Sequence, residues 1–260
     1  MDNRPIGIFD SGVGGLTVLK EYLKELPNEN YIYFGDTARL PYGSKSKNTI
    51  VEFSKQITEF LISQNVKLIV IACGTASAIA YQDLVKSFDL PIIDIISPTA
   101  KAVKDSSIGV IATKATIKSQ AWENEIHQYS PHTKIHSIAC PLFVPIVEEG
   151  FADSEIAKLA VKEYLSAFEK SDITSLILGC THYPILKNTI QTQLGEKIKL
   201  MNAGHYSALY AKEYLEQNNL LAENTGELSF YSSDDGNYFK EIAKNFFPVI
   251  ENYNVQKCML

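Results

Sequence analysis

Hydrophobic and polar residues follow a repeating pattern along the chain that predicts strands and helices in alternation. Short apolar runs, typical of strands, are separated by segments whose apolar residues recur every three or four positions, as on one face of a helix. The predicted strands cover residues 5–10, 31–35, 67–72, 91–96, 108–113, 134–140, 176–179, 198–202 and 228–232. Strands alternating with helices favour a mostly parallel α/β sheet.

The segments between the strands carry the helical spacing. The apolar residues that mark the first two helices are Leu16, Leu19, Leu23 and Leu26, and then Ile50, Phe53, Ile57, Phe60 and Leu61. Further helices are expected over about residues 116–128 and 154–169, and two more end near residues 217 and 247. Asp153 or Ser154 is the predicted cap of the helix over 154–169. Its predicted buried face consists of Ile156, Leu159, Ala160, Tyr164 and Phe168.

Two regions of the sequence resemble each other and indicate a duplicated unit. Residues 6–11 (IGIFDS) resemble residues 108–113 (IGVIAT), and IVIACGTA around Cys73 parallels LILGCTHY around Cys180. We therefore expect two pseudo-symmetric α/β domains with open, mostly parallel sheets and an active site in the cleft between them. The predicted first domain comprises residues 1–97 and 208–260, and the predicted second domain comprises residues 98–207.

Composition narrows the class of protein. The chain has 260 residues, of which 45% are hydrophobic and 21% charged, as in ordinary globular proteins. Its net charge of −6 argues against a nucleic-acid-binding protein, which normally has a basic face. No apolar run reaches the roughly 18 residues of a membrane span, and the first residues lack the pattern of a signal peptide. We expect a cytoplasmic protein.

The chain has four cysteines, at positions 73, 140, 180 and 258, with neither CxxC pairs nor zinc-finger spacing. Free thiols are expected in a reducing compartment. Cys140 precedes a proline and has no polar companion, so buried packing is the expected role, and Cys258 is expected to have none. The histidines at 127, 132, 136 and 205 lie in surface-like segments. No metal site is predicted.

Cys73 and Cys180 are different, because each ends a predicted central strand just before a helix. In open α/β sheets, ligands bind beyond the carboxyl ends of the strands. Two facing domains would bring both thiols to one cleft, on opposite sides of a ligand.

Racemisation removes a proton from one face of a carbon and returns one to the other, which requires two acid–base groups. A thiol/thiolate couple suits this, since free cysteine has a pKa of roughly 8.5.

The residues beside these cysteines fit the same chemistry. Gly74 with Thr75, and Thr181 with His182, offer N–H groups and hydroxyls where a carboxylate binds readily. His182 could polarise Cys180. Asp10 and Ser11, in the glycine-rich turn after the first strand, could do the same for Cys73. That turn, over residues 10–15, lacks the GxGxxG spacing of a dinucleotide site, and we interpret it as a substrate-approach loop, although a plain tight turn has the same pattern.

At these residues the sequence resembles the glutamate racemase family, within the aspartate/glutamate racemase superfamily. The motifs are GIFDSGVGG at 7–15, FGDTARLPYG at 34–43, IACGTASA at 71–78, CPLFVPIVEEG at 140–150 and LGCTHYPIL at 178–186. The resemblance runs over nearly the whole chain. The histidine after Cys-Thr is the most telling feature, because aspartate-type members usually lack it.

The resemblance implies a reaction and a set of site residues. Cys73 is expected to take the α-proton of the D-substrate and Cys180 that of the L-substrate, assisted by Asp10 and by Glu148 with His182, respectively. The substrate contacts that it implies are Asp10, Ser11, Tyr42, Gly43, Gly74, Thr75, Thr113, Thr116, Thr181 and His182. It further implies glutamate as substrate, no cofactor and no metal, a bacterial source, a role in supplying D-glutamate for peptidoglycan, and a homodimer.

Two positions depart from the family pattern: Trp122 stands where tyrosine is common, an expected packing difference, and the other departure lies beside the first cysteine. Asparagine usually follows the first cysteine, and here Gly74 stands instead. The backbone N–H is retained, but the amide side chain is lost, and with it a hydrogen bond worth roughly 1 kcal/mol. We therefore expect that asparagine at this position would lower the Michaelis constant.

Two other functions remain open from the sequence. An aspartate racemase, or another isomerase of the superfamily, would share the fold and the thiol pair. A non-catalytic amino-acid-binding or regulatory protein would share only the scaffold, and it would have no need for matched thiols. An aspartate racemase would act faster on aspartate than on glutamate. A non-catalytic binding protein would not exchange the α-hydrogen of the substrate with solvent.

Overall fold

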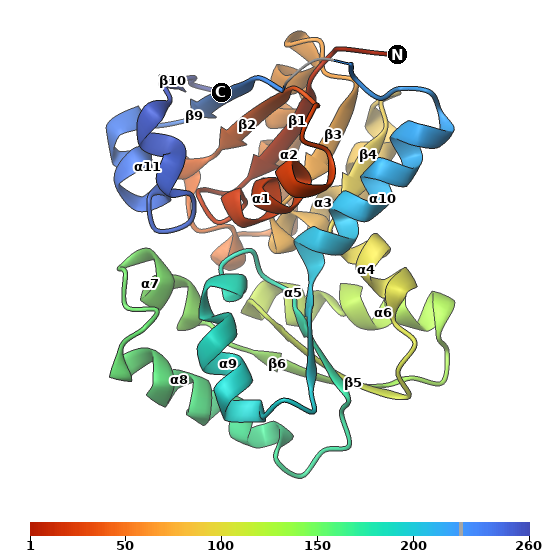
Figure 1. Cartoon of the computed structure of the whole chain (residues 1–260), viewed down its shortest axis with the longest axis vertical. Coiled ribbons are helices and arrows are strands. Elements are labelled where there is room, and N and C mark those ends of the chain that lie inside the picture. The colour runs from red at the N-terminus through yellow and green to blue at the C-terminus, as the bar shows by residue number, and fades with distance from the viewer. Residues whose placement is uncertain (224–225) are drawn as a thin grey trace.

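The computed structural model describes residues 1–223 and 226–260, which form two layered α/β units, one above the other (Figure 1). The upper sheet has the strand order β10-β9-β2-β1-β3-β4, and the lower sheet has the order β6-β5-β7-β8. Every strand pairing in both sheets is parallel. The predicted fold of two open parallel-sheet units is therefore confirmed.

The strands of the upper sheet are β1 (Ile6–Asp10), β2 (Tyr31–Gly35), β3 (Leu68–Ile71), β4 (Ile92–Asp94), β9 (Leu228–Ser232) and β10 (Val255–Lys257). Those of the lower sheet are β5 (Ser107–Ala112), β6 (Lys134–Ala139), β7 (Ser175–Leu178) and β8 (Lys199–Asn202). The central strands β1, β3, β5 and β7 are buried along their whole length. Their continuous apolar runs follow from this, because helices cover both faces of a parallel sheet.

The helices are α1 (Leu16–Glu25), α2 (Lys47–Ser63), α3 (Gly74–Ser87), α4 (Ile96–Ala102), α5 (Lys114–Ser119), α6 (Ala121–Tyr129), α7 (Phe143–Glu148), α8 (Glu155–Leu165), α9 (Lys187–Leu194), α10 (Ala203–Gln217) and α11 (Gly236–Ala243). Helices α4 and α10 carry the chain from one sheet to the other (Figure 1). The domain boundaries predicted at 97/98 and 207/208 fall inside these two helices. That division of the chain stays a prediction.

Several predicted elements differ from the observed ones, and the helix expected over 154–169, for example, ends at Leu165. The helix expected over 116–128 is two helices, α5 and α6, separated at Gln120, whose φ of 55° ends the first helix in a left-handed conformation. The strand expected over 91–96 is the shorter β4, because the Asp94 carboxylate accepts hydrogen bonds from the N–H groups of Ile96 and Ser97 and starts α4. The last predicted helix ends at Ala243 rather than near residue 247.

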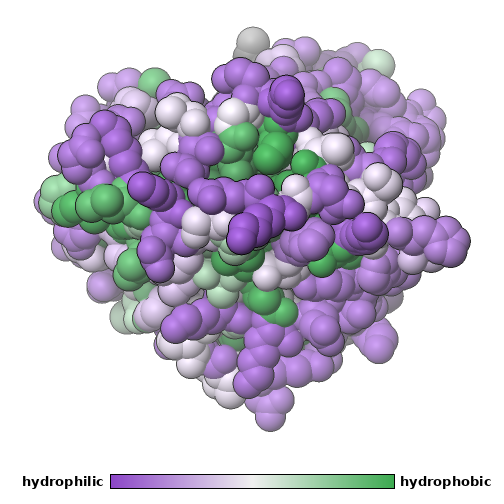
Figure 2. All heavy atoms as spheres, turned by 90° about the horizontal axis from the view of Figure 1, so that it is seen from below, coloured by the Kyte–Doolittle hydropathy of each residue, from purple (hydrophilic) through white to green (hydrophobic). Residues whose placement is uncertain are grey.

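The predicted buried face of α8 is wrong in part. Ile156 and Leu159 are 55% and 68% exposed, and the buried stripe contains smaller residues that the prediction passed over, Ala157 and Val161. The predicted cap is confirmed at Ser154, whose hydroxyl accepts a hydrogen bond from the N–H of Ala157. Figure 2 views the molecule from the side of the lower sheet and shows separate hydrophobic areas on a largely hydrophilic surface.

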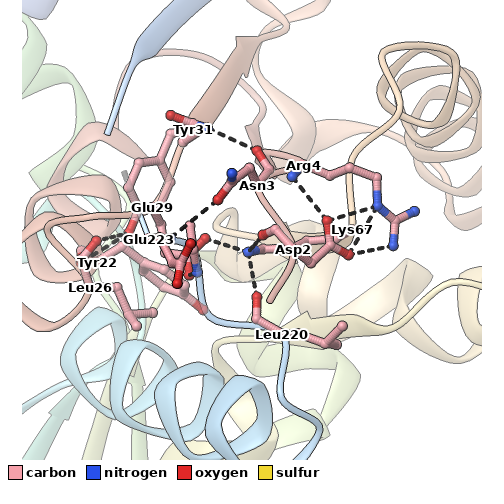
Figure 3. Close-up of polar contacts among 12 residues, drawn as sticks. Asp2, Asn3, Arg4, Tyr22, Leu26, Glu29, Tyr31, Lys67, Leu220 and Glu223 are labelled. Atoms are coloured by element: carbon pink, nitrogen blue, oxygen red, sulfur yellow. Dashed lines mark hydrogen bonds and ion pairs between the residues drawn. The ribbon is translucent and has the colours of Figure 1, made fainter. Parts of the chain in front are cut away.

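A buried ion pair joins segments distant in sequence at the amino ends of the upper strands (Figure 3). Lys67 Nζ lies 2.5 Å from Glu29 Oε2 and donates to the carbonyls of Asp2 and Leu220, both at 2.6 Å. Removing one partner of such a pair typically destabilises a fold by about 3–5 kcal/mol. The pair therefore stabilises the fold. It lies at the opposite end of the upper sheet from Cys73.

Candidate active site

Cys73 and Cys180 occupy equivalent positions in the two sheets. The last paired residues are Phe9 with Ile71 between β1 and β3, and Ile111 with Leu178 between β5 and β7. Each cysteine lies two residues beyond the end of this pairing, at the carboxyl edge of its sheet. The duplicated unit predicted from the sequence is thus seen in the strand register.

Both cysteines line one cleft of about 480 Å³ between the two halves of the molecule. Their exposed fractions are only 5% for Cys73 and 7% for Cys180. The predicted site residues that line the cleft with them are Ser11, Tyr42, Gly43, Gly74, Thr75, Thr113, Glu148, Thr181 and His182. Asp10 and Thr116 are fully buried behind this wall. The wall also includes residues that were not predicted, among them Leu40, Lys114 and Val144.

The surroundings of Cys73 keep its thiol protonated. Its sulfur accepts a hydrogen bond from the N–H of Ala76 at 3.4 Å and donates to Ser11 Oγ at 3.5 Å. Burial, together with the nearby Asp10 carboxylate, raises the pKa of Cys73 to about 12. Burial also raises the pKa of Asp10, against the lowering effect of His182. Asp10 Oδ2 accepts from the N–H of Gly12, while Oδ1 has no hydrogen-bond partner in the described part of the chain.

The surroundings of Cys180 place a positive charge beside its sulfur. His182 Nδ1 lies 3.8 Å from Cys180 Sγ, and His182 Nε2 lies 2.8 Å from Glu148 Oε1. Burial alone would lower the pKa of His182, but its hydrogen bonds with Cys180 and Glu148 raise that pKa to about 10. An imidazolium at neutral pH stabilises negative charge on the Cys180 sulfur.

Hydroxyl groups connect the two halves around the cleft. Thr75 Oγ1, from the upper half, lies 3.1 Å from Thr113 Oγ1 and 3.5 Å from Thr116 Oγ1, both in the lower half. Thr17 in α1 donates to the carbonyl of Thr181 at 2.7 Å. Thr17 was not predicted as a site residue, because its partner Thr181 lies 164 positions away in the sequence.

Tyr42 reaches the cleft on a loop that an ion pair secures. Its hydroxyl donates to the carboxylate of Asp36, which also accepts from the side chain of Arg39. Arg39 in turn donates to Gln56 in α2 and lies over the Phe53 ring. The motif FGDTARLPYG therefore supplies both the cleft residues, Tyr42 and Gly43, and the network that fixes them.

Gly74 marks a close approach between the two halves. A Cβ atom at this position would lie 2.5 Å from the carbonyl oxygen of Gly179, which belongs to the lower half. Side chains do not tolerate such a contact with backbone. An asparagine here would have to displace the Gly179 backbone, so this contact argues against the expectation that asparagine lowers the Michaelis constant.

The remaining two cysteines do not line the cleft. Cys140 is fully buried, and burial raises its pKa. Cys258 is half-buried near the end of the chain, away from the cleft. Within residues 1–223 and 226–260, no group of three or more His, Cys, Asp or Glu residues is arranged to hold a metal ion. No helix among these residues is long and apolar enough to cross a membrane.

Comparison with known proteins places this fold and cleft in a family. The family model described as Asp/Glu/Hydantoin racemase matches residues 9–204. The glutamate racemase of Streptococcus agalactiae is 42% identical, over 100% of both chains. The crystal structure of glutamate racemase from Francisella tularensis in complex with D-glutamate superposes with a TM-score of 0.92 at 42% identity, covering 99% of this chain and 98% of that one. Picrophilus torridus aspartate racemase, with a TM-score of 0.60 at 15% identity over 82% of this chain and 94% of that one, shares the fold alone.

The chain therefore belongs to the Asp/Glu/hydantoin racemase family, and it is an isomerase. Within that family it is the glutamate racemases that it resembles over its full length, which confirms the resemblance carried by its sequence motifs.

Proposed function

We propose that this protein interconverts L-glutamate and D-glutamate without a cofactor, using Cys73 and Cys180 as the two acid–base groups. The observation that carries the proposal is that both thiols line one cleft, each from a different half of the molecule. Glutamate is favoured as substrate because relatives with that name are 42% identical over the full length. The aspartate racemase shares only 15% identity.

The proton transfers follow from the two environments. With L-glutamate, the Cys180 thiolate beside the His182 imidazolium takes the α-proton, and the Cys73 thiol returns a proton to the opposite face. The product is D-glutamate, with Cys73 left as thiolate and Cys180 as thiol. D-glutamate reacts by the reverse transfers. Neither direction requires a redox step or a second reactant.

The substrate carboxylates need donors, and the cleft offers them from several elements. Helix α3 begins at Gly74, so its first N–H groups lack intrahelical partners and point toward the end where an anion binds. Ser11, Thr75, Thr113 and Thr181 add hydroxyl groups to the same cleft. Donors fixed in a largely buried cleft also stabilise the charge that develops at the α-carbon.

The cellular role follows from the activity. D-glutamate is a building block of peptidoglycan, and we propose that the protein supplies it in the cytoplasm of a bacterium as a homodimer. The net charge of −6 is compatible with a protein that handles small molecules rather than nucleic acid.

Single replacements Cys73→Ser and Cys180→Ser test the proposal. Each variant should lose racemisation by roughly 10²–10⁴-fold, the contribution of a positioned acid–base group, while still binding D-glutamate. Polarimetry with L-glutamate measures the loss, and calorimetric titration with D-glutamate measures the binding. Full turnover in either variant would rule out the two-thiol scheme, and faster racemisation of L-aspartate than of L-glutamate by the unmodified protein would overturn the substrate.

A further inference from the structure

His182 belongs to the lower half of the molecule, but residues of the upper half enclose its ring. The ring of Phe246 meets the His182 imidazole edge-on, with 5.2 Å between ring centroids and 87° between planes. Phe246 follows α11, an element of the upper half that lies directly above α7 in Figure 1. The contact therefore crosses the interface between the halves beside the active-site cleft.

Phe246 is itself held in place. Its side chain is 0% exposed, and its N–H donates to the carbonyl of Ala243 at the end of α11. Its carbonyl accepts a hydrogen bond from Lys20 Nζ of α1 at 3.3 Å. Because its N–H and its carbonyl are both hydrogen-bonded, Phe246 has a fixed position and can restrain a neighbouring side chain.

The glycine-rich turn closes another side of the imidazole. A Cβ atom at Gly14 would collide with Cε1 and Nδ1 of His182, so the turn backbone packs directly on that ring edge. The hydrogen bonds of His182 require one ring orientation, with Nδ1 toward Cys180 and Nε2 toward Glu148. Turning the ring would break both contacts, and Gly14 and Phe246 leave no space for it to turn.

We propose that Phe246 is a positioning residue for His182, holding the imidazole where it activates Cys180, and that it has no corresponding effect on Cys73. This proposal rests on the proposed function, since it takes His182 to be the partner of Cys180. The titratable groups that act on His182 are Cys180, Glu148 and Asp10. None of them belongs to the segment that carries Phe246, so replacing this residue changes packing and leaves those charges unchanged.

Alkylation by iodoacetamide at pH 7, followed separately at each cysteine by peptide mass spectrometry, tests the proposal. Phe246→Leu removes the ring and should slow alkylation of Cys180 by about two- to tenfold, the fold-change expected for losing one aromatic pair. Cys73 in the same molecule is the internal reference, and its rate should stay within twofold. Racemase activity should fall in parallel with the Cys180 rate.

Phe247→Leu is the matched control. Phe247 is the adjacent ring, 6% exposed, and it packs against Phe230 rather than His182. The control should leave the ratio of the Cys180 and Cys73 rates unchanged. Phe246→Met, which keeps more of the apolar volume, serves if the leucine variant does not fold, and should lower the ratio in the same direction.

An unchanged or faster Cys180 rate in the Phe246 variants would overturn the proposal. Equal slowing at both cysteines, or the same fall in the ratio in Phe247→Leu, would also overturn it, because either result would mean general loosening. Failure of the proposed racemase function would instead appear as turnover in Cys180→Ser, a measurement that the alkylation ratio does not use.

Discussion

The two halves place their cysteines at the same register position but put different titratable groups beside them. At the end of β1, Asp10 puts a carboxylate near Cys73, and the equivalent position at the end of β5 is Ala112. Two residues after Cys180 stands His182, where the first half has Thr75. The duplicated strands thus set where each thiol lies, while single substitutions at two repeated positions set its charge environment.

This difference means that the two thiols are not equivalent in the resting protein. Burial and Asp10 keep Cys73 as a thiol, whereas the imidazolium of His182 favours negative charge on Cys180. The proposed two-thiol reaction needs one thiol and one thiolate in each turnover. The two thiols therefore lie beside different charged groups before substrate arrives, a carboxylate near Cys73 and an imidazolium beside Cys180.

The largest expected effect comes from removing the cation on the Cys180 side. His182→Asn should reduce racemisation by roughly 10²–10⁴-fold and slow alkylation of Cys180 while leaving that of Cys73 unchanged. Because the pKa of His182 is about 10, the imidazolium is present below that pH, and its effect on Cys180 should disappear as the pH rises through 10. Rates at both cysteines from pH 7 to 11 measure this, and equal slowing of both would contradict the comparison.

A smaller effect is expected where the halves touch. Gly74→Asn forces a Cβ against the Gly179 carbonyl, and overpacking of this kind costs about 1–3 kcal/mol. Since the strain falls between two units, they can separate to relieve it, which widens the cleft. We expect kcat/KM to fall by roughly 5–150-fold, with Gly74→Ala similar. A lower Michaelis constant in the asparagine variant would show that the cleft accommodates the amide after all.

The smallest effect, and one of opposite sign, is expected on the Cys73 side. Asp10→Asn removes a carboxylate that raises the pKa of Cys73, so this pKa should fall. At pH 9 the thiol is still mostly protonated, and each unit by which the pKa falls increases the thiolate about tenfold. Alkylation of Cys73 should therefore become faster, by up to about tenfold, even as catalysis weakens. Slower alkylation would mean that Asp10 activates Cys73 in the resting protein.

Much of this arrangement could be predicted from the sequence because it depends on local pattern. The strand at 31–35 was predicted to the residue, and a strand near 228–232 was also predicted. The apolar runs that end at Cys73 and Cys180 correctly indicated the carboxyl edges of both sheets. His182 was found because it lies two residues from Cys180. These features require only alternation, strand length and short spacing.

The remaining features depend on how the halves pack against each other, which no local pattern encodes. Thr17 reaches Thr181, Gly74 meets Gly179, and Phe246 covers His182, each pairing residues far apart in the chain. Phe246 in the sequence is one more apolar residue near the last helix. The face of α8 was misjudged for a related reason, since large side chains were favoured over the smaller Ala157 and Val161 that are buried.

Deuterium exchange at the α-carbon in single-cysteine variants tests the central claim most directly. Each enantiomer is incubated in D₂O with Cys73→Ser or Cys180→Ser, and label is measured by proton NMR. The two-sided arrangement predicts that Cys180→Ser, with Cys73 remaining, labels only D-glutamate, and that Cys73→Ser labels only L-glutamate. If either variant labelled the other enantiomer equally well, the two thiols would not lie on opposite faces of the substrate.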